Sequence, residues 1–119
     1  MVHKRILAFG YALNGFKIAW QEEAHFKFHV CAAIVALLAA WALHITSTEF
    51  IIILILIGMV MSAEIFNAAL EEICDKYTPE HDPHIGKIKD LAAAAVFVAS
   101  CVALIIGAII FYPYILTRS

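Results

Sequence analysis

The sequence predicts an all-α integral membrane protein, with an amphipathic interfacial helix followed by three transmembrane helices. Hydrophobic residues make up 64% of the 119-residue chain, and its mean hydropathy is +0.90. A typical soluble domain has only about 45–50% apolar residues. Three apolar segments are long enough to cross a bilayer, and the basic residues gather on one side of them. We therefore expect residues 1–119 to form one membrane-embedded domain.

The first predicted element is a helix over residues 5–26 that lies in the membrane interface. Its apolar residues recur at spacings of 3 and 4, namely Ile6, Phe9, Leu13, Phe16 and Trp20. Polar residues occupy another face, which is typical of a helix lying along a membrane surface. A signal peptide is the alternative, but glycines and polar residues interrupt its apolar core before a cleavage site could follow.

Three transmembrane spans are predicted after this helix, over residues 28–45, 50–70 and 91–116. The third begins with small residues, Ala92–Ala95, which would let helices approach one another closely. It ends in an aromatic group that is typical of a membrane interface, and we expect Pro113 within that group to fray the helix end.

The distribution of basic residues predicts the orientation of these spans. Seven of the eight Lys and Arg residues lie before the first span or between the second and third, and only Arg118 lies on the opposite side. Positively charged loops stay in the cytoplasm. We therefore expect the N-terminus and the loop from Lys76 to Lys89 to be cytoplasmic, and the C-terminus to lie outside.

A stripe of polar residues at the cytoplasmic end of the second span is the strongest functional signal. Its members follow one another at spacings of 3, 4 and 4 and therefore share one helical face: Glu64, Asn67, Glu71 and Asp75. A carboxylate in a bilayer costs about 2.5–3.5 kcal/mol on insertion scales. Such a stripe therefore implies a cation, a polar substrate, or both.

Other polar residues are predicted on the same side of the membrane: Glu22, Glu23, Lys87, Lys89 and Asp90. Carboxylates with a lysine and an amide can hold Mg²⁺ and a polyphosphate, and a remaining carboxylate can accept a hydroxyl proton. The sequence has no glycine-rich phosphate-binding motif, so a nucleotide would be held by side chains on helices. Two alternatives are a structural network of ion pairs, and an ion-coupled transporter that uses Glu64 as its coupling carboxylate.

Several other polar residues carry weaker signals. His81 and His84, in the second linker, could bind a metal ion, but histidines in such a loop are more often simply solvated. His25 and His29 are expected at the interface. Glu49 is expected on the outer side, remote from the other residues named here.

The order and spacing of these residues resemble the bacterial diacylglycerol kinase family, which includes the undecaprenol kinases. The family signature, roughly ExxN[ST]AxExxxD, matches residues 64–75, EIFNAALEEICD. The resemblance extends to AWQEEAHF at residues 19–26 and to GKIKDLAA at residues 86–93. Ala68 departs from the expected Ser or Thr, which leaves the hydrogen bonding of that turn open. His29 stands where some members have an acid, so no role is transferred to it.

The resemblance implies a homotrimer whose active sites are shared between subunits. It implies that Glu64 is the catalytic base, and that Glu23 and Glu71 hold the metal ion carried with ATP. It also implies that Asn67 and Lys89 contact phosphate, and that Asp75 and Asp90 contact the nucleotide or its lysine.

The expected activity is the Mg²⁺-dependent transfer of phosphate from ATP to a membrane lipid alcohol in the bacterial inner membrane, at a cytoplasmic site. The tail of the chain is more similar to undecaprenol kinases, so we favour undecaprenol over diacylglycerol. We expect contacts with membrane lipids and no nucleic-acid partner. The multidrug-type transporter stays as the alternative, although it predicts an even number of spans and little charge bias.

Overall fold

Four helices make up the described part of the chain in the computed structural model, which covers residues 2–77 and 82–118. They are α1 (Val2–Glu22), α2 (Ala24–Leu43), α3 (Ser47–Tyr77) and α4 (Pro83–Arg118). The last three are long and apolar enough to cross a membrane. The all-helical class and the three candidate spans predicted from the sequence are thus confirmed.

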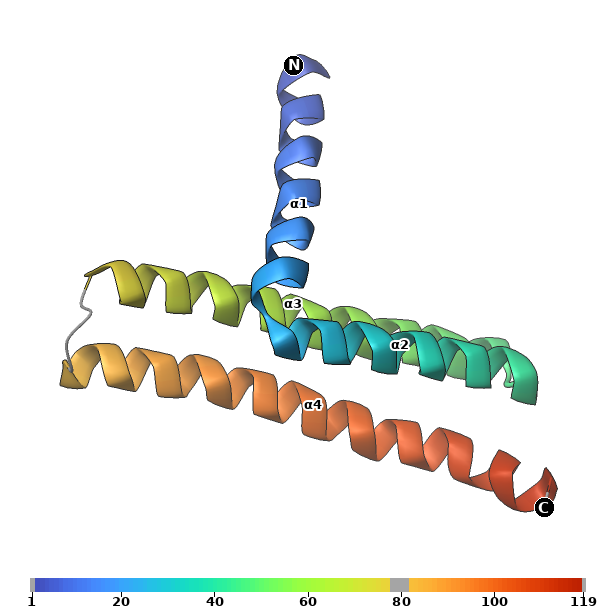
Figure 1. Ribbon diagram of the computed structural model, residues 1–119. Helices are drawn as coiled ribbons and strands as arrows, with labels where there is room; N and C mark the ends of the chain where they lie inside the picture. Colours follow the sequence, from blue (N-terminus) through green and yellow to red (C-terminus); the bar gives the residue numbers. More distant parts are fainter. Residues whose placement is uncertain (1, 78–81, 119) are drawn as a thin grey trace.

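The chain turns sharply at Glu23, and α1 stands nearly perpendicular to the other three helices (Figure 1). The backbone of Glu23 is extended, with φ −113° and ψ 105°. The turn allows Ala19 and Phe26, on either side of it, both to be buried. The single helix predicted over residues 5–26 is therefore wrong at its end, because residues 24–26 already belong to α2.

A short turn joins α2 to α3, and both helix ends are capped. His44 adopts a left-handed conformation with φ 53°, and the amide of Ile45 donates to the carbonyl of Ala40 at 3.3 Å. Thr46 and Glu49 then form a reciprocal capping box. The Glu49 amide donates to Thr46 Oγ1 at 3.2 Å, and the Thr46 amide donates to Glu49 Oε1 at 3.0 Å.

The two longest helices, α3 and α4, run side by side and make the most extensive contact in the chain (Figure 1). Their buried core consists of Ile53, Leu56 and Ile110. At about 1.5 Å per residue, the 31 residues of α3 exceed the hydrocarbon thickness of about 30 Å. The helix therefore continues past the predicted span of residues 50–70 and carries its acidic end beyond the apolar part.

The C-terminal end of α4 differs from the expectation that Pro113 frays it, because the helix continues to Arg118. The hydroxyl of Thr117 donates to the carbonyls of Pro113 and Tyr114, at 3.0 and 3.1 Å. Such side-chain donors satisfy carbonyls near a helix end.

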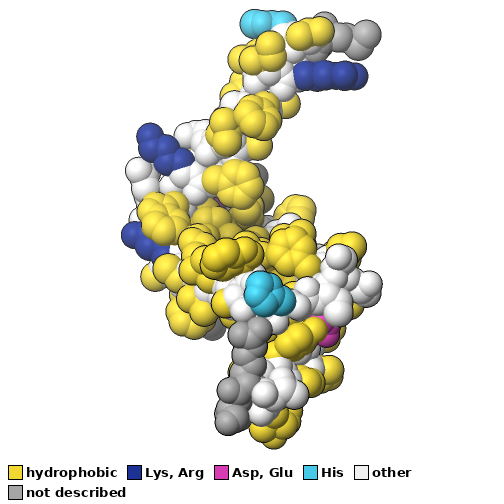
Figure 2. Space-filling view, turned by 90° about the vertical axis from the view of Figure 1, so that its right-hand side faces the viewer, with side chains coloured by type: hydrophobic (Ala, Val, Ile, Leu, Met, Phe, Trp, Pro, Cys, Tyr) yellow, Lys and Arg dark blue, Asp and Glu magenta, His cyan; other side chains and the backbone are white. Residues whose placement is uncertain are grey.

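The surface of the chain is largely apolar. Figure 2 views the molecule from the end where α2 joins α3, and hydrophobic side chains cover most of that face. The basic side chains in view gather in the upper half of the picture, towards α1. The apolar residues predicted for the interfacial face of α1 are all exposed: Ile6, Phe9, Leu13, Phe16 and Trp20. Nothing in the described chain covers this face.

Candidate active site

The polar stripe predicted on the second span lies on α3 and becomes more exposed towards the end of that helix. Glu64 is only 7% exposed and is the one charged residue that is buried among those described. Asn67 and Glu71, one and two turns further on, are partly buried, and Asp75 is exposed. A group bound along this stripe would therefore have its water-facing end near Asp75 and its buried end near Glu64.

Glu23 faces the stripe from the junction of α1 and α2. Its side chain makes no capping hydrogen bond to α2 in the described structure, so the carboxylate is available to other groups. Partial burial raises the pKa of Glu23, and the negative charges of Glu71, Glu64 and Glu22 raise it further, while His25 opposes them. Acids on two different elements thus converge closely enough to repel one another. A cation between them would relieve that repulsion.

Asn67 joins this cluster with one of its two polar atoms satisfied. Its Nδ2 donates to Glu71 Oε1 at 3.2 Å, which holds the Glu71 carboxylate on the stripe. Its Oδ1 is buried and has no hydrogen-bond partner within residues 2–77 and 82–118. A buried oxygen without a partner costs about 1–3 kcal/mol, so a bound ligand or a second chain would be a favourable partner for it.

One cation reaches the stripe from α4. Lys89 Nζ lies 2.6 Å from Asp75 Oδ1, and both side chains are substantially exposed, at 41% and 65%. This pair places a positive charge at the open end of the stripe. It is the contact between Asp75 and a lysine that the family resemblance implied as one possibility.

Asp90 is exposed and lies apart from that pair. It lines a shallow cavity of about 460 Å³ at the start of α4, together with Pro83, Gly86, Lys87 and Leu91. Consecutive helical residues point about 100° apart, so Lys89 and Asp90 face different directions from the same turn. The structure therefore brings Asp75 and Lys89 together and leaves Asp90 out of that pair.

A histidine that the sequence analysis left without a role contacts the most buried acid. His29 Nε2, on α2, lies 2.9 Å from Glu64 Oε1, on α3. The available signal was the departure noted at this position, a histidine where some related sequences have an acid. Periodicity within one helix could not reveal the contact, since it depends on how two helices pack.

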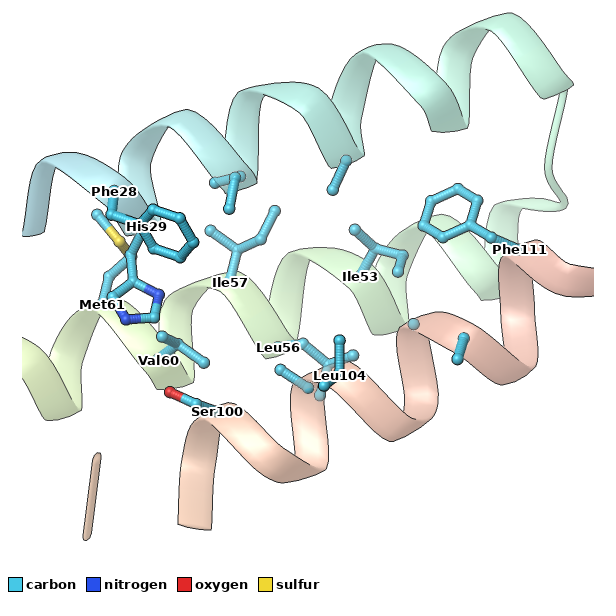
Figure 3. A pocket seen from close by; sticks show the side chains of 16 residues that line it. Phe28, His29, Ile53, Leu56, Ile57, Val60, Met61, Ser100, Leu104 and Phe111 are labelled. Carbon is cyan, nitrogen blue, oxygen red and sulfur yellow. The ribbon is translucent and has the colours of Figure 1, made fainter. Parts of the chain in front are cut away.

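An apolar cavity of about 650 Å³ lies between α2, α3 and α4, and His29 stands at one end of it (Figure 3). Phe28, Met61 and Val60 surround the imidazole there, and Phe111 lies at the opposite end. Ser100 is the other polar side chain in the described lining, and the remaining residues are apolar.

The end of the bundle where α2 joins α3 holds a separate polar cluster that the sequence analysis missed. Tyr114 Oη, on α4, donates to Glu49 Oε1, and the Thr46 hydroxyl donates to the same oxygen at 3.0 Å. The expectation that Glu49 is remote from other named residues is therefore wrong, because α4 brings Tyr114 over the start of α3.

Of the two linker histidines, only His84 lies within the described residues, and it belongs to no group of three possible metal ligands there. The amide of His84 donates to Asp82 Oδ1 at 2.8 Å, which is a local turn contact at the start of α4. His81 lies outside the described residues. Among the residues that are described, no three His, Cys, Asp or Glu side chains form a metal site by themselves. A metal ion held by the described acids would therefore need further ligands, for example from a bound molecule.

The arrangement as a whole can bind a metal polyphosphate at the end of a membrane helix. Two acids and an amide face each other, a lysine stands at the open end, and a buried acid lies deeper in the bundle. Nucleotide phosphates bring oxygen ligands that complete a Mg²⁺ site built from one or two carboxylates. The buried acid is then placed to act on a group that enters from the membrane.

Comparisons with known proteins match this chain to lipid kinases. The family model described as prokaryotic diacylglycerol kinase matches residues 10–111. The chain is 36% identical to the undecaprenol kinase of Bacillus subtilis (strain 168) over 106 residues, or 89% of this chain and 86% of that protein. It is 31% identical to the diacylglycerol kinase of Escherichia coli (strain K12) over 109 residues, or 92% and 89% of the two chains. It is also 34% identical to the diacylglycerol kinase of Pseudomonas aeruginosa, over 81% of this chain and 79% of that one.

Proposed function

Because this chain belongs to the prokaryotic diacylglycerol kinase family and is a lipid kinase, we propose that it transfers the γ-phosphoryl group of ATP to the hydroxyl of a membrane lipid alcohol, with Mg²⁺. Kinases of this family use ATP as phosphate donor. The observation that carries the assignment to these residues is the convergence of Glu23 on the α3 stripe beside Lys89. The transporter alternative has no support from the comparisons, and three candidate spans argue against its even number.

Glu64 is the catalytic base of the proposed reaction. It is the most buried member of the stripe and so lies nearest to where a lipid hydroxyl would enter. The hydroxyl oxygen forms a bond to the γ-phosphorus, the bond from that phosphorus to the bridging oxygen of ADP breaks, and ADP leaves. Glu64 accepts the hydroxyl proton, which makes the lipid oxygen a better nucleophile.

The residues present fit Mg²⁺. Glu23 and Glu71 offer carboxylate oxygens from two elements, and the negative charge of Glu71 contributes to the raised pKa of Glu23, which supports a shared site. The unpartnered Oδ1 of Asn67 is a further oxygen of the kind that Mg²⁺ accepts directly or through water. When bound, the ion neutralises charge on the phosphate oxygens. Glu23 and Glu71 would hold it, and the Asn67 amide keeps Glu71 in place.

The remaining predicted residues bind the nucleotide in this proposal. Lys89 offers its ammonium group to phosphate oxygens, and Asp75 holds that group at the open end of the stripe. Asn67 supports the phosphate from the α3 side. Asp90 lies at the start of α4 beside its own cavity and contacts the more distant part of the nucleotide.

Undecaprenol is the favoured acceptor, and diacylglycerol is the alternative. The identity to an undecaprenol kinase is 36%, against 31% and 34% for two diacylglycerol kinases. Phe66 and Leu70 expose apolar surface beside the stripe, which suits a polyprenyl chain, whereas Phe26 is buried. A site that hydrogen-bonds glycerol esters would reject a polyprenol strongly, while an apolar site discriminates modestly.

The deciding experiment is phosphate transfer from radiolabelled ATP to each lipid in mixed micelles of one detergent. Label in lipid phosphate that depends on Mg²⁺ supports the proposed function, and no transfer to either lipid overturns it. A kcat/KM for diacylglycerol tenfold above that for undecaprenol would reverse the preferred acceptor and keep the lipid kinase.

The proposed active unit is a homotrimer in which residues 1–119 form one domain of each subunit, with sites shared between subunits. One chain leaves the Asn67 oxygen without a partner and the apolar face of α1 uncovered within the described residues. The α1 helix is proposed to lie in the cytoplasmic interface of the bacterial inner membrane, because most basic residues lie on α1, at the start of α2 or near the linker between α3 and α4. The C-terminus would then lie outside.

Subunit mixing tests the shared sites. Inactive Glu23→Gln and inactive Glu71→Gln chains are mixed in detergent, and recovered activity is expected if the two residues act from different subunits. Each variant mixed with itself is the control. No recovery together with a monomeric mass in mild detergent would overturn the trimer, whereas no recovery from trimers would place both residues on one chain.

A further inference from the structure

His29 reaches the proposed catalytic base from a different helix. The distance from His29 Nε2 to Glu64 Oε1 is 2.9 Å, which is within hydrogen-bonding range. Glu64 is 7% exposed and the His29 side chain 20% exposed, so water has little access to the contact. Among the described residues, no Lys or Arg forms an ion pair with Glu64. The imidazole is therefore the cationic or hydrogen-bonding partner that the structure gives this acid.

The imidazole is held in a fixed place by apolar neighbours. Its ring meets Phe28 edge to face, with ring centres 5.6 Å apart and planes at 81°. The other side of the ring lines the apolar cavity, beside Met61 and Val60 (Figure 3). A hydrogen bond with so little competing water is stronger than one at the surface. The ring can thus hold the carboxylate in one orientation.

We infer that His29 is a positioning residue for Glu64, an inference that rests on the proposed function of Glu64 as base. The Nε2–H group donates to Oε1 of the ionised carboxylate, and Oε2 stays free to accept the hydroxyl proton of the lipid alcohol. Without the donor, the carboxylate can rotate about its own side-chain bonds. A misplacement of about 1 Å can cost about 10²-fold in rate, and the loss appears in kcat.

The obvious alternative is a contact that only ties α2 to α3. Two substitutions separate these roles. His29→Leu removes the donor and keeps an apolar side chain of moderate size. His29→Gln keeps an N–H donor at nearly the reach of Nε2. A structural tie would weaken the fold in His29→Leu, whereas a positioning role also requires that His29→Gln restores turnover.

Steady-state transfer of phosphate from ATP to undecaprenol is measured on the full chain in mixed micelles. His29→Leu is expected to lower kcat by about 10–100-fold, with the KM values for ATP and lipid within about threefold of wild type. His29→Gln should recover most of the lost kcat. Ser100→Ala, at the other polar side chain of the same cavity, is the matched control and should keep wild-type kinetics.

A double variant completes the test. In a Glu64→Gln background, His29→Leu should cause no further loss, since the group it positions is already gone. Equal losses in both backgrounds would overturn the inference, as would full kcat in His29→Leu. A loss confined to the KM for lipid would also overturn it and would make His29 a lipid contact. If His29→Leu does not fold, His29→Asn, with its amide one methylene shorter, serves as the donor-misplaced variant.

These outcomes stay distinct from failure of the proposed function. If the wild-type chain transfers no phosphate to either lipid, or if Glu64→Gln keeps more than half of its turnover, the role of Glu64 fails and that of His29 fails with it. If Glu64→Gln is inactive while His29→Leu is fully active, only the role of His29 fails.

Discussion

The two ends of the helical bundle each carry a glutamate on α3, but they surround it differently. At the end where α2 joins α3, Glu49 accepts hydrogen bonds from Thr46 and Tyr114 and completes the cap of its own helix. At the other end, Glu64 and Glu71 face a third acid, Glu23. Burial raises the pKa of Glu23, and the negative charges of Glu71 and Glu64 raise it further. Glu49 accepts hydrogen bonds from donors of its own chain and faces no other acid of the stripe, which is the pattern of a structural acid. Glu64 and Glu71 each have one contact of their own chain, with His29 and Asn67, but they also face the negative charge of Glu23, and such a cluster of acids indicates a ligand.

The sharpest test of this comparison is the pair Glu64→Gln and Glu49→Gln. We expect Glu64→Gln to lower turnover by about 10²–10⁴-fold, the usual contribution of a general base, and to leave binding of Mg²⁺ and ATP largely intact. Glu49→Gln should keep wild-type turnover. Phosphate transfer and nucleotide binding are measured for both. More than half of wild-type turnover in Glu64→Gln would mean that the base lies elsewhere.

The next largest effect is expected at the metal ligands. Glu23→Gln and Glu71→Gln should each weaken the apparent affinity for Mg²⁺ by at least about tenfold. Removing a residue that only hydrogen-bonds to a metal ligand already lowers metal affinity by about that factor. Nucleotide binding should weaken with it. Mg²⁺ titrations of activity at saturating ATP measure the change. Unchanged titration curves in both variants would remove these residues from the metal site.

The raised pKa of Glu23 adds a pH dependence to that result. Mg²⁺ binds the ionised carboxylate, so the affinity of the wild-type protein should rise as the pH climbs above the ordinary glutamate value of about 4.3 and through the raised pKa of Glu23. Glu23→Gln should lose this part of the dependence. Mg²⁺ titrations from acidic to neutral pH, in both proteins, provide the comparison.

The same shift predicts an opposite effect on stability. An acid whose pKa is raised by folding stabilises the folded state at low pH, and that contribution is lost as the pH rises through the raised value. Without Mg²⁺ at neutral pH, Glu23→Gln should therefore unfold at a slightly higher temperature than wild type. Thermal unfolding in detergent with a chelator measures it. A clear loss of stability in Glu23→Gln would mean that the ionised Glu23 carboxylate has stabilising partners in its own chain, as Glu49 has.

Lys89 provides a smaller test of the same end. Its ion pair with Asp75 is exposed, and such pairs contribute only about 0–1 kcal/mol to stability. Lys89→Met should therefore raise the KM for ATP several-fold while the unfolding temperature changes little. Lys17→Met, on α1, is the control for removing one positive charge. Equal KM values in the two variants would contradict a phosphate contact at Lys89.

The smallest effect on activity, with a measurable effect on stability, is expected at the cluster of Glu49, Thr46 and Tyr114. Tyr114→Phe removes the donor to Glu49 and should destabilise the fold by about 1 kcal/mol, the typical net value of one hydrogen bond. Turnover should stay at the wild-type level. Denaturant unfolding in micelles, alongside the transfer assay, checks both. A loss of turnover without a loss of stability would mean that the two ends are coupled.

The sequence alone predicted what depends on neighbours along one helix. Hydropathy located the three spans, and the 3.6-residue period placed Glu64, Asn67, Glu71 and Asp75 on one face. Two helices extend past the predicted spans of residues 50–70 and 91–116, because hydropathy marks the apolar part of a helix, whereas backbone hydrogen bonding carries α3 on to Tyr77 and α4 through Pro113. The first predicted span, residues 28–45, instead runs past Leu43, where α2 ends. The family, and with it the lipid kinase activity, also followed from residue order and spacing.

Only the tertiary structure decided which helices meet. The break at Glu23 turns that acid towards α3, α2 brings His29 to Glu64, and α4 brings Tyr114 to Glu49. The physical reason is that a helical period is a local property, fixed by backbone geometry over a few residues. The pairing of faces depends on side-chain packing between residues far apart in the chain, and no spacing within one helix encodes it.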